Sequence, residues 1–467
     1  RFFGAKGDRM IEKYYNGVIE QVAGGIGNVE HNSILVRYSN DFSIWDLESV
    51  NHYKDQTDIF FTCHEFSYNK IAEAYEPYLG LIRQMFHKYC SGTLEEFMEE
   101  CDVYKLQRPV FESYFEKGFC ERTEQILIDE VEYEQERMHS SIVTMLQKLS
   151  EICPIVIVLN RFQLASKSTM QLTNRLLQTK NKNIGIVLGV NDVQSIPEFA
   201  HEEWDAICES MDDRNMVYHI GNAGRNMEPD VMDYYSDYES DDGYRKLNNL
   251  VYFLDFDQAN HHLSKIERRI KFDNFTISEK KHYQLLLLQI MVSVLQRDIA
   301  KALESCEDLE KLQDQEKEGA FYYNFWMATS YMYLGKLEEA MIYVQKAKEC
   351  GEALGDDFLV FRAELLKAQN QMSGWCNIFF CAQDIEISDK LIEKLNAYHY
   401  KNHLAHIYIY AYDNKPEIVA KAYRSEAFLI YFSKGVALAK EIGNEQLISI
   451  AYRKNIMIAS TNGEYEV

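Results

Sequence analysis

The chain has 467 residues, of which 46% are hydrophobic and 13% aromatic, so it is long enough and apolar enough for two or three packed domains. Its formal net charge of −24 argues against nucleic acid or an anionic membrane surface as the main partner, because both are negatively charged. No apolar run approaches the ~20 residues of a membrane helix, and the ten unpatterned cysteines are typical of a reducing cytosol.

Residues 1–222 alternate short apolar runs with helical stretches. This alternation predicts an α/β domain, in which a parallel sheet carries helices on both faces. The predicted strands are Ser33–Tyr38, Asp58–Cys63, Pro154–Asn160, Ile184–Val190 and Met216–Ile220. Ligands of such sheets lie at the carboxyl ends of the strands, so the residues that follow each strand are the candidate site.

The order of these segments resembles STAND-class signal-transduction ATPases. The opening Arg1–Gly4 (RFFG) is similar to the entry of that domain, and Ser33–Tyr38 stands where its P-loop strand stands. Residues 154–178 resemble the second signature, and Ile184–Val190 resembles the sensor strand. The resemblance implies a P-loop-like fold and a role in signalling, and it covers about 220 residues.

The phosphate-binding loop does not match this family. A working loop needs glycines, then Lys and Ser or Thr, because backbone N–H groups wrap the phosphates while the side chains supply charge and bind Mg²⁺. The loop here instead contains Asn40, Asp41, Ser43, Ile44 and Trp45, with Ile44 near the lysine position. We therefore expect a degenerate nucleotide site without a bound cofactor.

The strand of the second signature ends without the expected acid. In P-loop ATPases a carboxylate at this place organises Mg²⁺ and the attacking water. Asn160 stands there, followed by Arg161, and Asp192 follows the next strand. An atypical NTPase that binds ATP through a non-standard loop would have to use Asn160, Arg161 and Asp192. We keep that enzyme as the alternative to a pseudo-ATPase, and we assign no catalytic residue.

Residues 223–246 are rich in acids and tyrosines, with little helical periodicity. A calcium loop is a second interpretation of Asp237–Gly243, but its glycine falls at the seventh position instead of the sixth. We favour a solvated acidic linker between two domains.

The pattern of residues 247–467 predicts a series of helices arranged in tetratricopeptide-like repeats. The clearest centre is Leu334–Ala340, where a glycine turn joins two helices that carry small residues at their crossing. Similar centres recur near Phe256, Asp298, Gly374, Asn414 and Gly463. Such units bury their apolar faces only by stacking, which predicts a solenoid with a concave face for a protein or peptide ligand or for self-association. The last repeat is incomplete at Val467, so we expect a piece of a longer protein.

Three histidines in this half have a spacing that suits a metal. His399, His403 and His406 would share one face of a continuous helix. Histidines that pack between repeats are the commoner explanation, and no carboxylate lies within that stretch.

The whole chain resembles the N-terminal region of large bacterial signalling proteins. In one clostridial group a GGDEF diguanylate cyclase domain follows such a region, and no GGDEF motif occurs here. The resemblance implies a regulatory scaffold that controls an output domain outside this chain.

Overall fold

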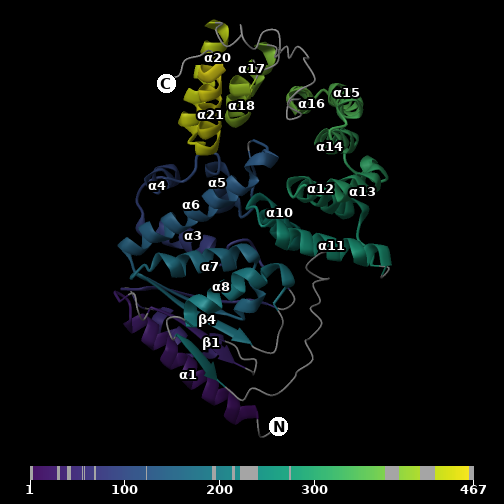
Figure 1. Ribbon diagram of the computed structural model, residues 1–467. Helices are drawn as coiled ribbons and strands as arrows, with labels where there is room; N and C mark the ends of the chain where they lie inside the picture. Colours follow the sequence, from purple (N-terminus) through teal and green to yellow (C-terminus); the bar gives the residue numbers. More distant parts are fainter. Residues whose placement is uncertain are drawn as a thin grey trace. The chain divides into compact units, whose positions relative to one another are not determined.

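The structure is a computed structural model with two compact units, and it describes most of the chain (Figure 1). Unit 1 comprises residues 1–103, 110–120 and 135–262, and unit 2 comprises residues 104–109, 121–134 and 263–467. The described residues are 4–28, 32–38, 44–54, 56, 58–67, 70–122, 124–191, 196–212, 216–220, 240–272, 275–373, 389–410 and 426–461.

Unit 1 contains a five-stranded parallel sheet. The strands are β1 (Ser33–Tyr38), β2 (Phe60–Glu65), β3 (Ile155–Asn160), β4 (Ile184–Asn191) and β5 (Val217–Ile220). They are ordered β2-β3-β4-β1-β5, and every neighbouring pair is parallel. The central strands β3 and β4 are buried along their whole length, as their unbroken runs of Ile, Val and Leu predict. All five predicted strands are confirmed, with ends that differ by at most two residues.

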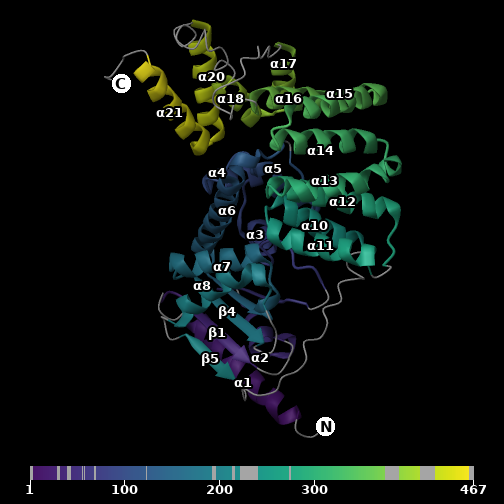
Figure 2. The same ribbon diagram turned by 45° about the vertical axis from the view of Figure 1, so that its right-hand side comes forward.

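Helices cover both faces of this sheet. Figures 1 and 2 show α1 on one side and α7 and α8 on the other. The helices of unit 1 before the acidic segment are α1 (Gly4–Gly24), α2 (Glu48–Lys54), α3 (Tyr78–Tyr89), α4 (Leu94–Glu100), α5 (Arg108–Lys117), α6 (Val131–Ile152), α7 (Lys167–Thr179) and α8 (His201–Asp212). Helices α5 and α6 begin in the last residues of the unit 2 segments 104–109 and 121–134.

The predicted linker ends in a helix. Residues 223–239 lie outside the described residues, but α10 (Asp241–Tyr252) begins within the segment that was expected to lack periodicity. The Ser240 side chain accepts a hydrogen bond from the Gly243 N–H, and Asp241 and Asp242 lie in the first turn, where acids suit the helix dipole. The acids thus initiate a helix. The two units meet in the chain later than residue 246, between His262 and Leu263.

Unit 2 is helical in its described part, and successive helices pack against each other (Figure 2). Its helices are the second half of α11 (Phe256–Phe272), α12 (Glu279–Leu295), α13 (Ile299–Glu310), α14 (Gly319–Tyr333), α15 (Leu337–Leu354), α16 (Asp357–Ser373), α17 (Asp389–Ala397), α18 (Lys401–Tyr410), α20 (Glu426–Ile442) and α21 (Glu445–Thr461). Ala328 and Ala340 are fully buried where α14 packs against α15, so small residues lie at this helix crossing.

One turn geometry recurs between these helices. Gly335 has φ 73°, and the N–H of the next residue bonds the carbonyl of Tyr331, which is the Schellman ending of a helix. Arg297, His399 and Gly443 occupy the same left-handed position after α12, α17 and α20. Of the predicted centres, Gly374, Asn414 and Gly463 lie outside the described residues.

Within the described part of the chain, every helix is too short or too polar to cross a membrane.

Candidate functional site

The carboxyl ends of β1, β3 and β4 meet at one edge of the sheet in unit 1. Strand β4 lies between the other two, yet the Tyr38 hydroxyl reaches across it and donates a hydrogen bond of 2.7 Å to Asn160 Oδ1. Both residues are fully buried. Asn160 therefore joins the strand ends through its amide, where the resemblance placed a metal-binding acid.

Gly189 in β4 makes this approach possible. A Cβ at Gly189 would lie 2.6 Å from Asn160 Oδ1 and would also collide with the hydroxyl of the buried Tyr15. Here glycine is required for space and not for backbone conformation, since its φ is not positive.

A largely buried carboxylate occupies the neighbouring position on the same edge. Glu65 ends β2 and pairs in register with Asn160. Its Oε1 lies 2.9 Å from Arg161 Nη1, and its Oε2 accepts a hydrogen bond of 3.3 Å from the backbone N–H of Ile44. The Glu65 side chain is 9% exposed and that of Arg161 18% exposed, so solvent screens this pair only in part. The backbone N–H of Ile44 and the guanidinium of Arg161 thus both bind the carboxylate of Glu65.

The residue near the lysine position points into the core. Ile44 is fully buried in a short 3-10 helix, η1 (Ile44–Asp46), whereas Trp45 is 47% exposed. The Lys54 ammonium lies 4.6 Å from the centre of the Trp45 ring, close enough for a cation–π contact. The other loop candidates Asn40, Asp41 and Ser43 lie outside the described residues, as does Asp192.

Titratable groups gather near the end of β2. Burial lowers the pKa of His64 to about 4, and its Nε2 lies 3.6 Å from Glu76 Oε1. Burial also raises the pKa of Glu76 and of Glu73, although Arg245 pairs with Glu73 at 2.7 Å. Burial thus disfavours the charged forms of His64, Glu73 and Glu76, while the ion pair with Arg245 stabilises the charge on Glu73.

The structure separates the three histidines of unit 2. His399 has φ 59° and precedes α18, so the continuous helix on which their metal spacing depended is absent. His403 Nδ1 and His406 Nε2 each contact a carboxylate, Glu124 and Glu130 respectively. Among the described residues, no group of three His, Cys, Asp or Glu side chains has the geometry of a metal site.

Sequence reasoning missed these carboxylates because they lie more than 270 positions earlier in the chain. It also missed Glu65, because the predicted second strand stopped two residues too early. No alternation of apolar and polar residues marks Glu65, because Cys63 is followed by two polar residues, His64 and Glu65.

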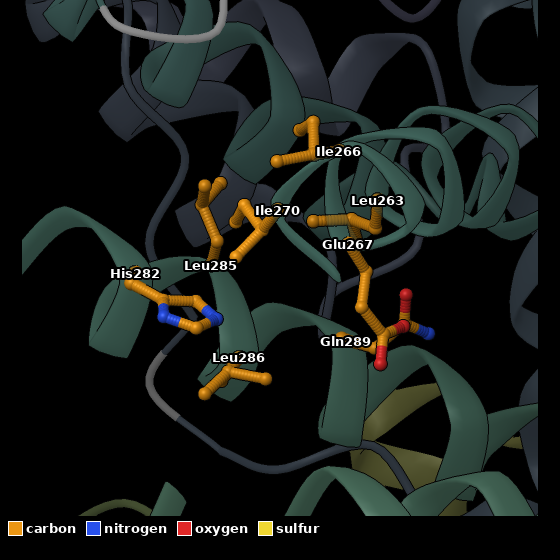
Figure 3. Close-up of a pocket in the computed structure, with 8 residues that line it drawn as sticks. All are labelled: Leu263, Ile266, Glu267, Ile270, His282, Leu285, Leu286 and Gln289. Carbon is orange, nitrogen blue, oxygen red and sulfur yellow. The ribbon is translucent and has the colours of Figure 1, made fainter. Parts of the chain in front are cut away.

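A small pocket lies between α11 and α12 in unit 2 (Figure 3). It has space for about one water molecule, far below the size of a small-molecule site. The side chains that line it are mostly aliphatic: Leu263, Ile266, Glu267, Ile270, His282, Leu285, Leu286 and Gln289. The pocket is a packing gap between these two helices.

Comparison with known proteins found no matching family model, no matching curated protein and no matching solved structure.

Proposed function

We propose that this chain is the regulatory region of a STAND-like signalling protein, in which the α/β unit no longer uses a nucleotide and the helical unit binds a protein or peptide. The observation that carries the proposal is the carboxylate of Glu65 at the strand ends. In a nucleotide site, backbone N–H groups and a cation hold phosphate oxygens. Here the N–H of Ile44 and the guanidinium of Arg161 hold Glu65 instead.

Electrostatic repulsion also disfavours the binding of a phosphate at this edge of the sheet. A buried carboxylate repels a second anion, and displacing it would leave Glu65 without its partners in a poorly solvated place. Asn160 supplies a neutral amide where Mg²⁺ needs an ionised acid. Both features support an α/β unit that acts as a fixed structural element in signalling.

The helical unit supports the partner-binding half of the proposal. Its helices form neighbouring pairs closed by the same turn, and α12 to α16 share one apolar core. Arrays of this kind use their extended surface to bind other chains. The bound chain would control an output domain outside these residues.

Calorimetric titration of the full chain with ATP and Mg²⁺ tests the α/β half. We expect no binding heat up to millimolar nucleotide. Micromolar binding that Arg161→Ala abolishes would overturn the proposal and favour the atypical NTPase. Arg175→Ala is the matched control, because Arg175 pairs with Glu136 on the surface of the same unit.

A further inference from the structure

A segment from the first half of the chain packs into unit 2. Residues 121–134 contact helices that lie about 270 to 320 positions later in the sequence. It forms a set of hydrogen bonds with α18 and with the α20–α21 turn. Two glutamates, Glu124 and Glu130, account for most of them.

The start of α18 holds Glu124. Its carboxylate accepts hydrogen bonds from the backbone N–H of Asn402 at 3.0 Å and of His403 at 2.6 Å. His403 Nδ1 also contacts it. Amides in the first turn of a helix have no partner within the helix, and the helix dipole favours a negative charge there. This end of α18 is therefore suited to a carboxylate.

Three side chains hold Glu130, which is 2% exposed. Asn402 Nδ2 and Asn444 Nδ2 donate at 2.5 and 2.7 Å, and His406 Nε2 lies 2.9 Å away. Burial by itself would raise the pKa of Glu130, but the hydrogen bonds from His406, Asn444 and Asn402 outweigh it and hold the pKa below its usual value. Glu130 is thus an ionised, fully coordinated buried acid.

Three of the residues that hold these acids, Asn402, His403 and Asn444, are buried, while the His406 side chain is 17% exposed. Asn444 is fully buried, donates to Asn402 Oδ1 at 2.9 Å, and accepts from the Leu447 N–H. Such a network fixes the direction of each amide, so the donors already point at the carboxylates. We call Asn402, His403, His406 and Asn444 the carboxylate site.

Stability alone is a poor reason for this arrangement. Burying an ion costs desolvation energy that an apolar side chain would avoid. A buried and hydrogen-bonded acid therefore contributes more to the selectivity of a contact than to the stability of the fold. The helices around the site have apolar cores of their own, one built around Leu395 and Leu404 and the other around Ile409 and Leu447. A set of donors that binds two carboxylates selectively is typical of a site that recognises an acidic peptide segment.

We infer that the carboxylate site is the partner-binding site of the helical unit, that it recognises an acidic peptide with two glutamates six positions apart, and that residues 121–134 are its resident occupant. The inference rests on the proposed partner-binding role of this unit. An external segment of the same chemistry would compete with the chain's own segment. Exposed cations flank the site: Lys401 pairs with Glu441, and Arg297 pairs with Asp129 of the resident segment.

A fluorescent peptide with the sequence of residues 121–134 tests the inference on the full chain. We compare the wild type with the double variant Glu124→Gln, Glu130→Gln, in which the resident segment loses both charges. We expect the variant to bind the peptide at least ten-fold more tightly than the wild type. A peptide with glutamine at both positions should not bind. Adding Asn444→Ala to the variant should weaken binding again.

The outcomes are distinguishable. Equal binding to the variant and the wild type, or equal binding of the glutamine peptide, would overturn the inference. If circular dichroism shows that the double variant has lost helix, the single variant Glu124→Gln replaces it, since this leaves the buried Glu130 in place. ATP binding would refute the proposed loss of nucleotide use in unit 1 without affecting this result, because the peptide titration reports on unit 2 alone.

Discussion

Arg161 lies at the end of β3 in a left-handed conformation, φ 54° and ψ 42°, and its guanidinium contacts Glu65 at the end of the adjacent strand β2. A non-glycine residue in this region costs energy that the surroundings must offset. The ion pair offsets part of this cost, and it links the ends of β2 and β3.

Arg161→Ala should lower the free energy of unfolding by about 1–3 kcal/mol, because it leaves the largely buried Glu65 without its charged partner. Urea unfolding followed by circular dichroism measures the change. Arg175→Ala is the control, and its exposed pair with Glu136 should contribute less than about 1 kcal/mol. Equal losses in both variants would show that the Arg161 pair is no stronger than a surface pair.

Gly189→Ala should be destabilising by about 1–3 kcal/mol, because the new methyl group would overlap Asn160 and Tyr15 in a packed sheet. Gly80→Ala provides the opposite case. Gly80 lies inside α3 with no atom near its would-be Cβ, so alanine should stabilise the helix by about 0.5–1 kcal/mol. Chemical denaturation of both variants measures whether the free energy of unfolding falls for Gly189→Ala and rises for Gly80→Ala. An unchanged free energy of unfolding in Gly189→Ala would contradict the close approach at the strand ends.

The fold was predictable from local patterns, whereas the contacts at the sites were not. Strands such as Ile184–Asn191 are continuous apolar runs, and the Leu334–Ala340 turn contains its glycine in the sequence. Asp241 and Asp242, in contrast, were assigned to a linker because acids are typical of both linkers and helix starts. The partner of Arg161 comes from β2, and the partners of His403 and His406 come from residues 121–134. Pairings of this kind depend on which strands and helices become neighbours, which periodicity does not specify.

The stability of unit 1 should fall as the pH is lowered from about 6.5 towards 4. Burial, with a smaller effect from Arg175, lowers the pKa of His139 from 6.5 to about 4. Between these values the unfolded chain binds a proton that the folded chain excludes, so stability is complete above 6.5 and decreases below it. His139→Phe should reduce this loss in urea unfolding at a series of pH values. The exposed His52→Phe is the matched control, and an identical pH dependence in both variants would contradict the assignment.

His399→Gly should raise the free energy of unfolding of unit 2 by about 1 kcal/mol, because glycine adopts φ 59° without the steric cost of a side chain. Gly335→Ala should have the reverse effect and a similar magnitude, since Gly335 has φ 73° and open space around it. Thermal unfolding of the two variants tests whether both positions have the same left-handed turn geometry. A zinc titration of His399→Gly adds a second readout: loss of tight zinc binding relative to the wild type would restore the metal interpretation of the histidines.

Ile44→Lys separates a degenerate nucleotide loop from one that lacks only its lysine. Ile44 is fully buried, so the new ammonium would enter the core of unit 1 and not a phosphate site. We expect no ATP binding in calorimetry and a loss of a few kcal/mol in stability, because burying an unpaired charge is costly. Trp45→Lys is the control. Trp45 is 47% exposed, so lysine there should change stability by less than about 1 kcal/mol. ATP binding by Ile44→Lys would show that Glu65 yields to phosphate, and the regulatory, nucleotide-free role of the α/β unit would then be wrong.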